Sequence, residues 1–154
     1  MAYYLSKERA KDIVGSYRRY LDYLHEHQGK FPPSAFKLGT ANWYQNAYEH
    51  KCPHDARLEK FTISESANEN GERSVTMLIR LSAAYDDGFI ELFYPKVFGY
   101  NLILPSCVKG HKDWVYDEFR LSKAGHVVHE IEWRDDNSNW IIEASDVNYQ
   151  WIPK

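Results

Sequence analysis

The chain has 154 residues, of which 44% are hydrophobic and 27% charged, and these values fit one globular domain with a single core. Its 12 Tyr and 5 Trp contribute to an aromatic content of 16%, which favours strands and therefore a β-rich domain. The net charge of −3 is uneven, because residues 85–154 contain 12 acidic and 7 basic side chains whereas residues 1–84 contain 10 and 12. An acidic half does not attract phosphate backbones, which argues against nucleic acid as a partner.

The acidic half has two interpretations. Solvated surface charge is the simpler one, and an acidic patch for a basic protein partner, such as a toxin, is the sharper one. Residues 1–25 lack the apolar core of a secretory signal, and no apolar run is long enough for a membrane span. We therefore expect a cytoplasmic protein with Cys52 and Cys107 as free thiols and no membrane partner.

Residues 6–27 are predicted to form an amphipathic helix, with Ser6 as its N-cap and Gly29 as its stop signal. Its apolar side chains recur at steps of three and four residues. They are Ala10, Ile13, Val14, Tyr17, Leu21 and Leu24.

A second, short helix is expected at residues 34–39, after a pair of prolines, and a helical turn is expected at residues 43–48. Together these elements make a helical segment over residues 6–48.

From Arg57 onward the apolar period changes to two, which indicates strands separated by turns rich in Asn, Asp and Gly. Pro95 is expected to end a strand or to force a bulge in it. The candidate strands cover residues 57–64, 75–82, 89–94, 97–104, 114–121, 127–133 and 140–149.

Short connections between these strands predict an antiparallel meander. The fold class expected over residues 1–154 is therefore a single α+β domain. An N-terminal helix or helix pair packs on a sheet of about six or seven strands that spans residues 57–150. Exposed strand edges permit a weak homodimer as well as a monomer.

The segment HVVHEIEW, residues 126–133, contains His-x-x-His-Glu, which on a helix could hold a metal or a catalytic base. Its β-branched residues indicate a strand instead, on which His126 and His129 face opposite ways. A three-residue hairpin loop that ends at Gly125, in the left-handed conformation, gives the register that best segregates apolar side chains.

That register pairs Phe119 with His129, Asp117 with Ile131 and Val115 with Trp133. Asp117 and His129 then become diagonal neighbours on the apolar face. An aspartate that orients a histidine is half of a general-base arrangement. It is also how proteins satisfy a half-buried histidine, and we favour this structural interpretation because no third catalytic member is identifiable.

The stretch HKCPHDA gathers His50, Cys52, His54 and Asp55, all of which are residue types that bind zinc or iron. Their spacing matches no closed metal site, so a local role at the start of the first strand is the simpler hypothesis. No nucleotide-binding or nucleophile-elbow motif occurs, and no cofactor is expected.

The segments HDARLEKFTI, WVYDEFRL, HVVHEIEW and WIIEASDVNY resemble a loose group of small bacterial proteins of unknown function. The likeness spans about residues 54–150. It rests on an HDA start to the first strand, here residues 54–56, and on a W-x-Y-[DE]-E strand, here Trp114 to Glu118. The resemblance implies an α+β meander, and some members of such groups are taken to be immunity proteins encoded beside toxins.

Two functions are therefore expected. The first is a non-enzymatic protein-binding module of a bacterial cytoplasm, with an immunity protein against a basic toxin as its narrower form. The alternative is a small metal-dependent or His/Asp-based hydrolase that uses His129 and Asp117, or the cluster of residues 50–55.

Overall fold

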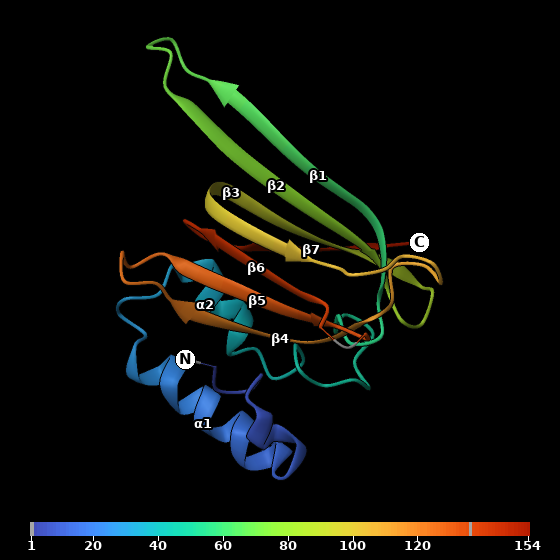
Figure 1. Cartoon of the computed structure of the whole chain (residues 1–154). Coiled ribbons are helices and arrows are strands. Elements are labelled where there is room, and N and C mark those ends of the chain that lie inside the picture. The colour runs from blue at the N-terminus through green and yellow to red at the C-terminus, as the bar shows by residue number, and fades with distance from the viewer. Residues whose placement is uncertain (1, 136) are drawn as a thin grey trace.

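The chain, seen in a computed structural model that describes residues 2–135 and 137–154, is an α+β fold with two helices near the N-terminus packed on a seven-stranded antiparallel sheet (Figure 1). The predicted fold class is thereby confirmed. The elements are a 3-10 turn at Lys7–Ala10, helices α1 (Ile13–Glu26) and α2 (Pro33–Gly39), and strands β1 (Arg57–Ala67), β2 (Arg73–Ser82), β3 (Gly88–Ile103), β4 (Trp114–Leu121), β5 (Val127–Trp133), β6 (Asn139–Ala144) and β7 (Asn148–Pro153).

The predicted first helix is interrupted. Asp12 caps α1, because its carboxylate accepts the Gly15 N–H at 2.9 Å, whereas Ser6 makes no capping bond with its side chain. Ile13 and Val14, which were predicted to lie on the apolar face, stand in the first turn of α1 and are exposed to solvent. The buried side chains of α1 are Ser16, Tyr20 and Leu24.

Helix α2 ends at Gly39 as predicted, but its N-terminus is capped from a distance. Asp146, which follows β6, accepts the N–H groups of Ser34 and Ala35 at 3.2 and 2.8 Å. This bond ties α2 to the far end of the chain. Residues 43–48, expected to contain a helical turn, form hydrogen-bonded turns without a helix.

Strand β3 joins two strands that were predicted separately. The register with β2 shifts between Tyr94 and Val97, so Pro95 lies in a bulge, where its missing N–H is tolerated. The strand is long enough to pair along the same sheet with β7 through its first half and with β6 through its second half.

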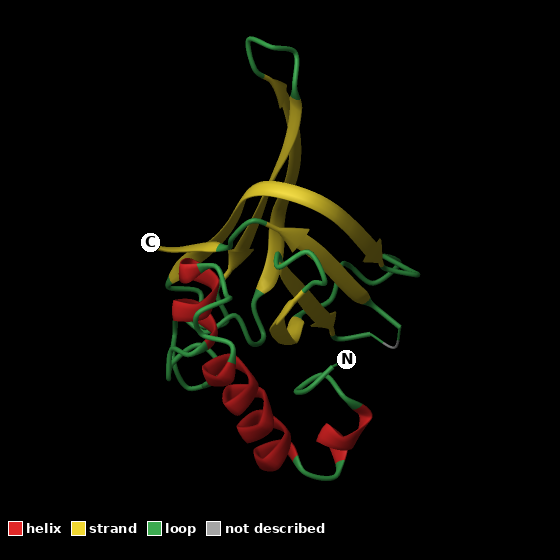
Figure 2. Cartoon of the chain, turned by 90° about the vertical axis from the view of Figure 1, so that its left-hand side faces the viewer, coloured by secondary structure: helices red, strands yellow, loops and turns green. Residues whose placement is uncertain are grey.

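The strand order is β1-β2-β3-β6-β5-β4, with β7 beside β3. Sequential neighbours pair within β1–β3 and within β4–β6, as a meander requires, but β3 pairs with β6 rather than with β4. Strand β4 thus becomes an outer edge of the sheet. Figure 2 shows the helices on one side of the curved sheet and the β1–β2 hairpin projecting away from them.

The outer edge of β4 is closed by side chains of α1. The backbone N–H groups of Phe119 and Leu121 donate to the hydroxyls of Tyr20 and Tyr23 at 2.8 and 2.9 Å. An unpaired N–H at a sheet edge invites another chain, and these tyrosines occupy the position of a neighbouring strand.

The carbonyl groups of the same edge are satisfied further along the N-terminal segment. Gln45 Nε2 donates to the carbonyl oxygen of Asp117 at 3.1 Å, and His54 Nδ1 donates to that of Val115 at 2.6 Å. The helical segment is therefore held to the sheet by directional bonds as well as by apolar contact.

Glu118 anchors the first residues of the chain. Its fully buried carboxylate accepts backbone N–H bonds from Tyr3, Tyr4 and Leu5, the shortest at 2.6 Å, and it also pairs with Arg120. A buried carboxylate needs such donors, because an uncompensated charge in the interior is strongly unfavourable.

We expect Tyr20→Phe to lower the free energy of unfolding by about 1–3 kcal/mol, because the buried N–H of Phe119 loses its acceptor. Tyr48→Phe is the matched control, because Tyr48 is 88% exposed. Urea denaturation of both variants checks this, and equal stability of the two would contradict the role assigned to the Tyr20 hydroxyl.

Candidate functional site

The β4–β5 hairpin confirms the predicted register over most of its length. Phe119 pairs with His129 and Asp117 with Ile131, and Gly125 has a φ of +82°. The last pair was wrong, because a bulge at Val115 places Trp114 opposite Trp133.

Asp117 and His129 are in contact, as the register predicted, with 2.8 Å between Oδ2 and Nε2. Because the carboxylate only accepts, Nε2 carries a proton. The other ring nitrogen, Nδ1, lies 2.7 Å from the hydroxyl of Tyr94. Burial, followed by the charge of Asp117, raises the pKa of Tyr94 well above its ordinary value, so the hydroxyl keeps its proton.

The carboxylate of Asp117 collects further donors. Tyr44 donates its hydroxyl hydrogen at 2.9 Å, Gln45 Nε2 lies at 3.2 Å and Trp114 Nε1 at 3.3 Å. The desolvation of Asp117 is thereby compensated from four side chains, which is typical of a structural polar cluster.

This cluster is closed to substrate. His129 is 0% exposed, Asp117 is 1% exposed and the ring of Phe119 packs against that of His129 in a tilted arrangement, with centroids 4.4 Å apart. The hydrolase hypothesis required a concave pocket that reaches His129, and a fully buried imidazole cannot contact a substrate atom. The geometry thus supports the structural interpretation of this pair.

His126 faces away from His129, as the alternation of side chains along a strand predicted. It lies 2.8 Å from Glu143 and stacks on Phe98, on the partly exposed side of the sheet.

The residues of HKCPHDA are dispersed rather than gathered. Cys52 is buried and its thiol donates to the carbonyl of Tyr44, while burial raises the pKa of this thiol to about 12. His54 is hydrogen-bonded to the Val115 carbonyl of β4, and Asp55 pairs with Arg134. Over residues 2–135 and 137–154, no three His, Cys, Asp or Glu side chains are placed to hold a metal ion.

His50 has a partner in Asp87, which lies in the turn before β3. Its Nδ1 lies 2.5 Å from Oδ2 of Asp87, and its ring stacks on Tyr85 with centroids 4.1 Å apart. The hydrogen bond from His50 lowers the pKa of Asp87. Both side chains are about half exposed, so this oriented imidazole is accessible where His129 is not.

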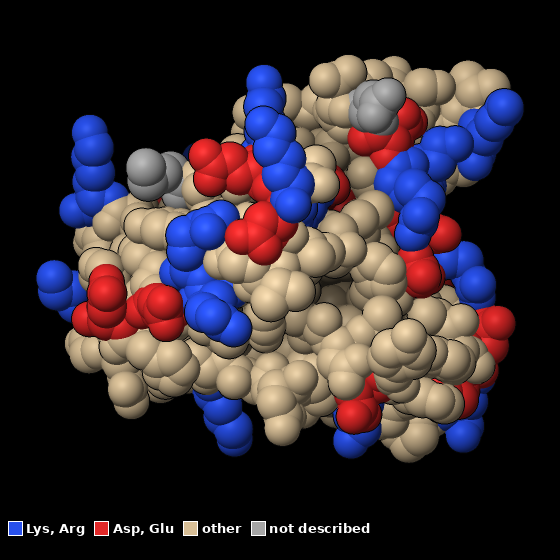
Figure 3. Space-filling model, turned by 90° about the horizontal axis from the view of Figure 1, so that it is seen from below, with Lys and Arg blue, Asp and Glu red and all other residues tan. Residues whose placement is uncertain are grey.

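Part of the acidic excess of residues 85–154 is paired with arginines of residues 1–84. Figure 3, seen from below, shows basic and acidic side chains interspersed on that face instead of separated by sign. On that face, charge gives little support to an acidic patch for a partner. Three such ion pairs are Arg9–Glu132, Arg57–Asp86 and Arg80–Glu91, whereas Arg134 of the acidic half pairs with Asp55.

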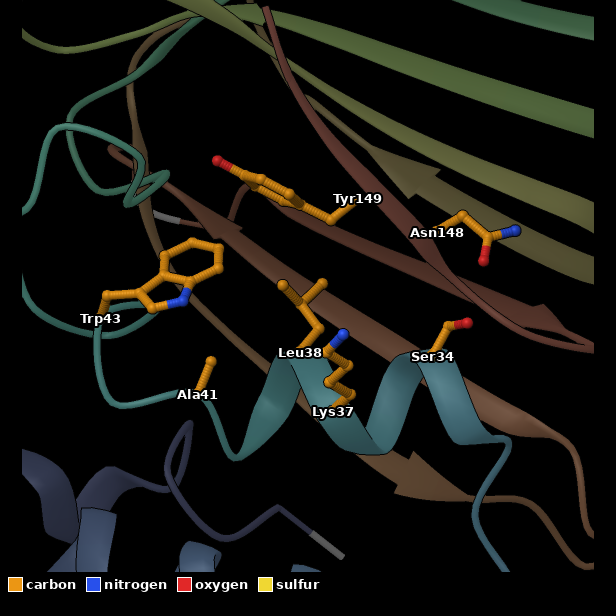
Figure 4. A pocket seen from close by; sticks show the side chains of 7 residues that line it. All are labelled: Ser34, Lys37, Leu38, Ala41, Trp43, Asn148 and Tyr149. Carbon is orange, nitrogen blue, oxygen red and sulfur yellow. The ribbon is translucent and has the colours of Figure 1, made fainter.

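A groove runs between β7 and the segment that follows α1, and we call it the α2–β7 groove. Its first part is a pocket of about 340 Å³, in which Trp43, Leu38 and Tyr149 point toward one another (Figure 4). A neighbouring pocket shares Trp43 and Tyr149 and extends the groove to His50 and Trp151. The residues of the first pocket are Ser34, Lys37, Leu38, Ala41, Trp43, Asn148 and Tyr149.

No protein-family model, curated protein or solved structure matches the chain. The resemblance to the group of small bacterial proteins therefore stays a prediction. Among the described residues, none of the helices is both long and apolar enough to cross a membrane.

The partners of Asp117 and His129 were missed, although one of them left a signal. Tyr94 is in phase with Ile90 and Leu92 on the buried face of β3, and a buried tyrosine hydroxyl usually has a partner. Tyr44 and Gln45 lie in turns about 70 residues before Asp117, and no local pattern connects them to it.

We expect Asp117→Ala to destabilise the fold by about 3–5 kcal/mol, because it leaves several buried donors without an acceptor. His129→Ala should also destabilise the fold. The double variant should lose less free energy of unfolding than the sum of the losses in the two single variants. Thermal and urea unfolding measure these changes, with the partly exposed His126→Ala as the control. Near-native stability of Asp117→Ala would show that the cluster is dispensable for folding.

Proposed function

We propose that this chain is a non-enzymatic protein-binding module whose contact surface is the α2–β7 groove. The observation that carries the proposal is that β7 pairs only with β3 among the described strands, so its outer edge is open beside an aromatic-lined groove. Trp and Tyr are enriched at protein interfaces, where they bury much area at low entropic cost. The contrast with the sealed edge of β4 supports a binding role for this edge.

The narrower form of the proposal is an immunity protein that neutralises a toxin in a bacterial cytoplasm. The sequence resemblance supports it, and so does the closed state of the His129 cluster, which removes one enzymatic alternative. A toxin-binding role needs tight, stoichiometric association and no catalytic group.

The first test fills the groove. Ala41→Arg places a long side chain in the first pocket, and Ala67→Arg, at the exposed end of β1, is the matched control. The wild type and the two variants, each immobilised, are exposed to lysate of the native bacterial host. We expect one protein to be retained in stoichiometric amount by the wild type and by Ala67→Arg, and to be lost with Ala41→Arg. Absence of any stoichiometric partner would contradict the proposal.

A His/Asp-based hydrolase is the second candidate, now centred on His50 and Asp87, because this pair is oriented, accessible and beside aromatic side chains. If it is right, the protein cleaves p-nitrophenyl acetate or bis-p-nitrophenyl phosphate and His50→Gln abolishes the turnover. His126→Gln, which removes another paired surface histidine, should retain it. Absence of turnover by the wild type would contradict the hydrolase candidate and leave the binding module as the one proposed function.

A further inference from the structure

The outer edge of β7 has a definite hydrogen-bonding pattern. The N–H of Lys154 donates to the carbonyl of Asp87, which fixes the phase of the antiparallel ladder between β3 and β7. Because bonded pairs alternate, the N–H and C=O groups of residues 148, 150 and 152 face β3. Those of Tyr149 and Trp151 therefore point away from the sheet, toward the open side.

The outer edges of β4 and of the first residues of β1 are protected. That of β4 is bonded to side chains, as described above. That of β1 carries Arg57, Glu59 and Lys60 and is bulged between Leu58 and Lys60, and both devices discourage strand pairing. On β7 only Pro153, at its very end, blocks pairing, because it has no N–H to offer. Two complete residues, Tyr149 and Trp151, remain available as a template.

The groove beside this edge has a chemical preference. Leu38, Ala41 and Trp43 give the first pocket an apolar wall, and Lys37 is its one charged lining residue. Lys37 is exposed and forms no ion pair with any side chain in the ranges 2–135 and 137–154. A carboxylate of a bound chain would complement it.

We propose that β7 binds an extended peptide segment of a partner protein by strand addition, with a large apolar side chain in the pocket at Trp43 and a carboxylate beside Lys37. Side chains of an extended segment alternate between faces, so the apolar and the acidic residue are expected two positions apart. Backbone bonds to Tyr149 and Trp151 supply affinity and the pocket supplies selectivity. This inference rests on the proposed binding function and names the chemistry of its ligand.

The probe is a synthetic peptide that carries the consensus selected from random linear peptides displayed on phage. We expect the consensus to contain an apolar and an acidic residue in alternate positions. Lys37→Glu should weaken the binding of the peptide by about tenfold, which is the scale of one lost charge contact at a partly exposed site. Lys60→Glu, on exposed β1, is the charge-matched control and should bind as the wild type does.

Amide hydrogen exchange followed by NMR tests the backbone bonds. In the free protein the amides of Gln150 and Ile152 should exchange slowly and those of Tyr149 and Trp151 quickly. Saturation with the peptide should slow exchange at Tyr149 and Trp151. Binding without this protection would overturn strand addition, as would Lys37→Glu and Lys60→Glu affecting affinity equally.

Two further outcomes separate this inference from the proposed function. If a stoichiometric partner is captured and lost with Ala41→Arg, but no linear peptide is selected, the binding module stands and strand addition is wrong. If Tyr149 and Trp151 become protected with rising protein concentration alone, β7 pairs with a second copy of the chain, and the peptide proposal is likewise overturned.

Discussion

The outer edge of β4 is the constraint on which the rest of the structure depends. Once β3 pairs with β6, β4 is left without a strand on one side, and its backbone groups need other partners. The N-terminal segment supplies them through Tyr20, Tyr23, Gln45 and His54. The position of α1 and of the turns after α2 is therefore set by hydrogen bonds to one strand, and apolar packing fills the space that they define.

Two adjacent carboxylates extend this attachment in opposite directions. Asp117 points into the core and gathers donors from three parts of the chain, while Glu118 points to the other face and holds the backbone of residues 3–5. Buried carboxylates are retained only where donors surround them, so each one fixes its partners in space. The buried Asp117–His129 pair thus contributes to the architecture, whereas the histidine that is both oriented by an aspartate and about half exposed is His50.

Local patterns predicted most of the sheet and little of the site. Alternation located Met77, Ile79 and Leu81 on the buried face of β2, and the loop that ends at Gly125 placed Asp117 near His129. Both depend on neighbours in sequence. The interruption before α1 was missed, because Ser6 was taken as the cap, whereas the carboxylate of Asp12 bonds to the Gly15 N–H.

The sequence by itself determined the α+β class, strands β1, β2, β4 and β5, most of the β4–β5 register and the contact of Asp117 with His129, because period, turn chemistry and β-branching act over a few residues. It divided β3 into two strands and joined β6 and β7 into one. Only the tertiary structure decided that β3 would pair with both β6 and β7, that His50 would meet Asp87, and that β7 would keep an open edge beside α2. These features join residues far apart in the chain. They follow from how the whole molecule satisfies its buried polar groups, and no local pattern encodes that solution.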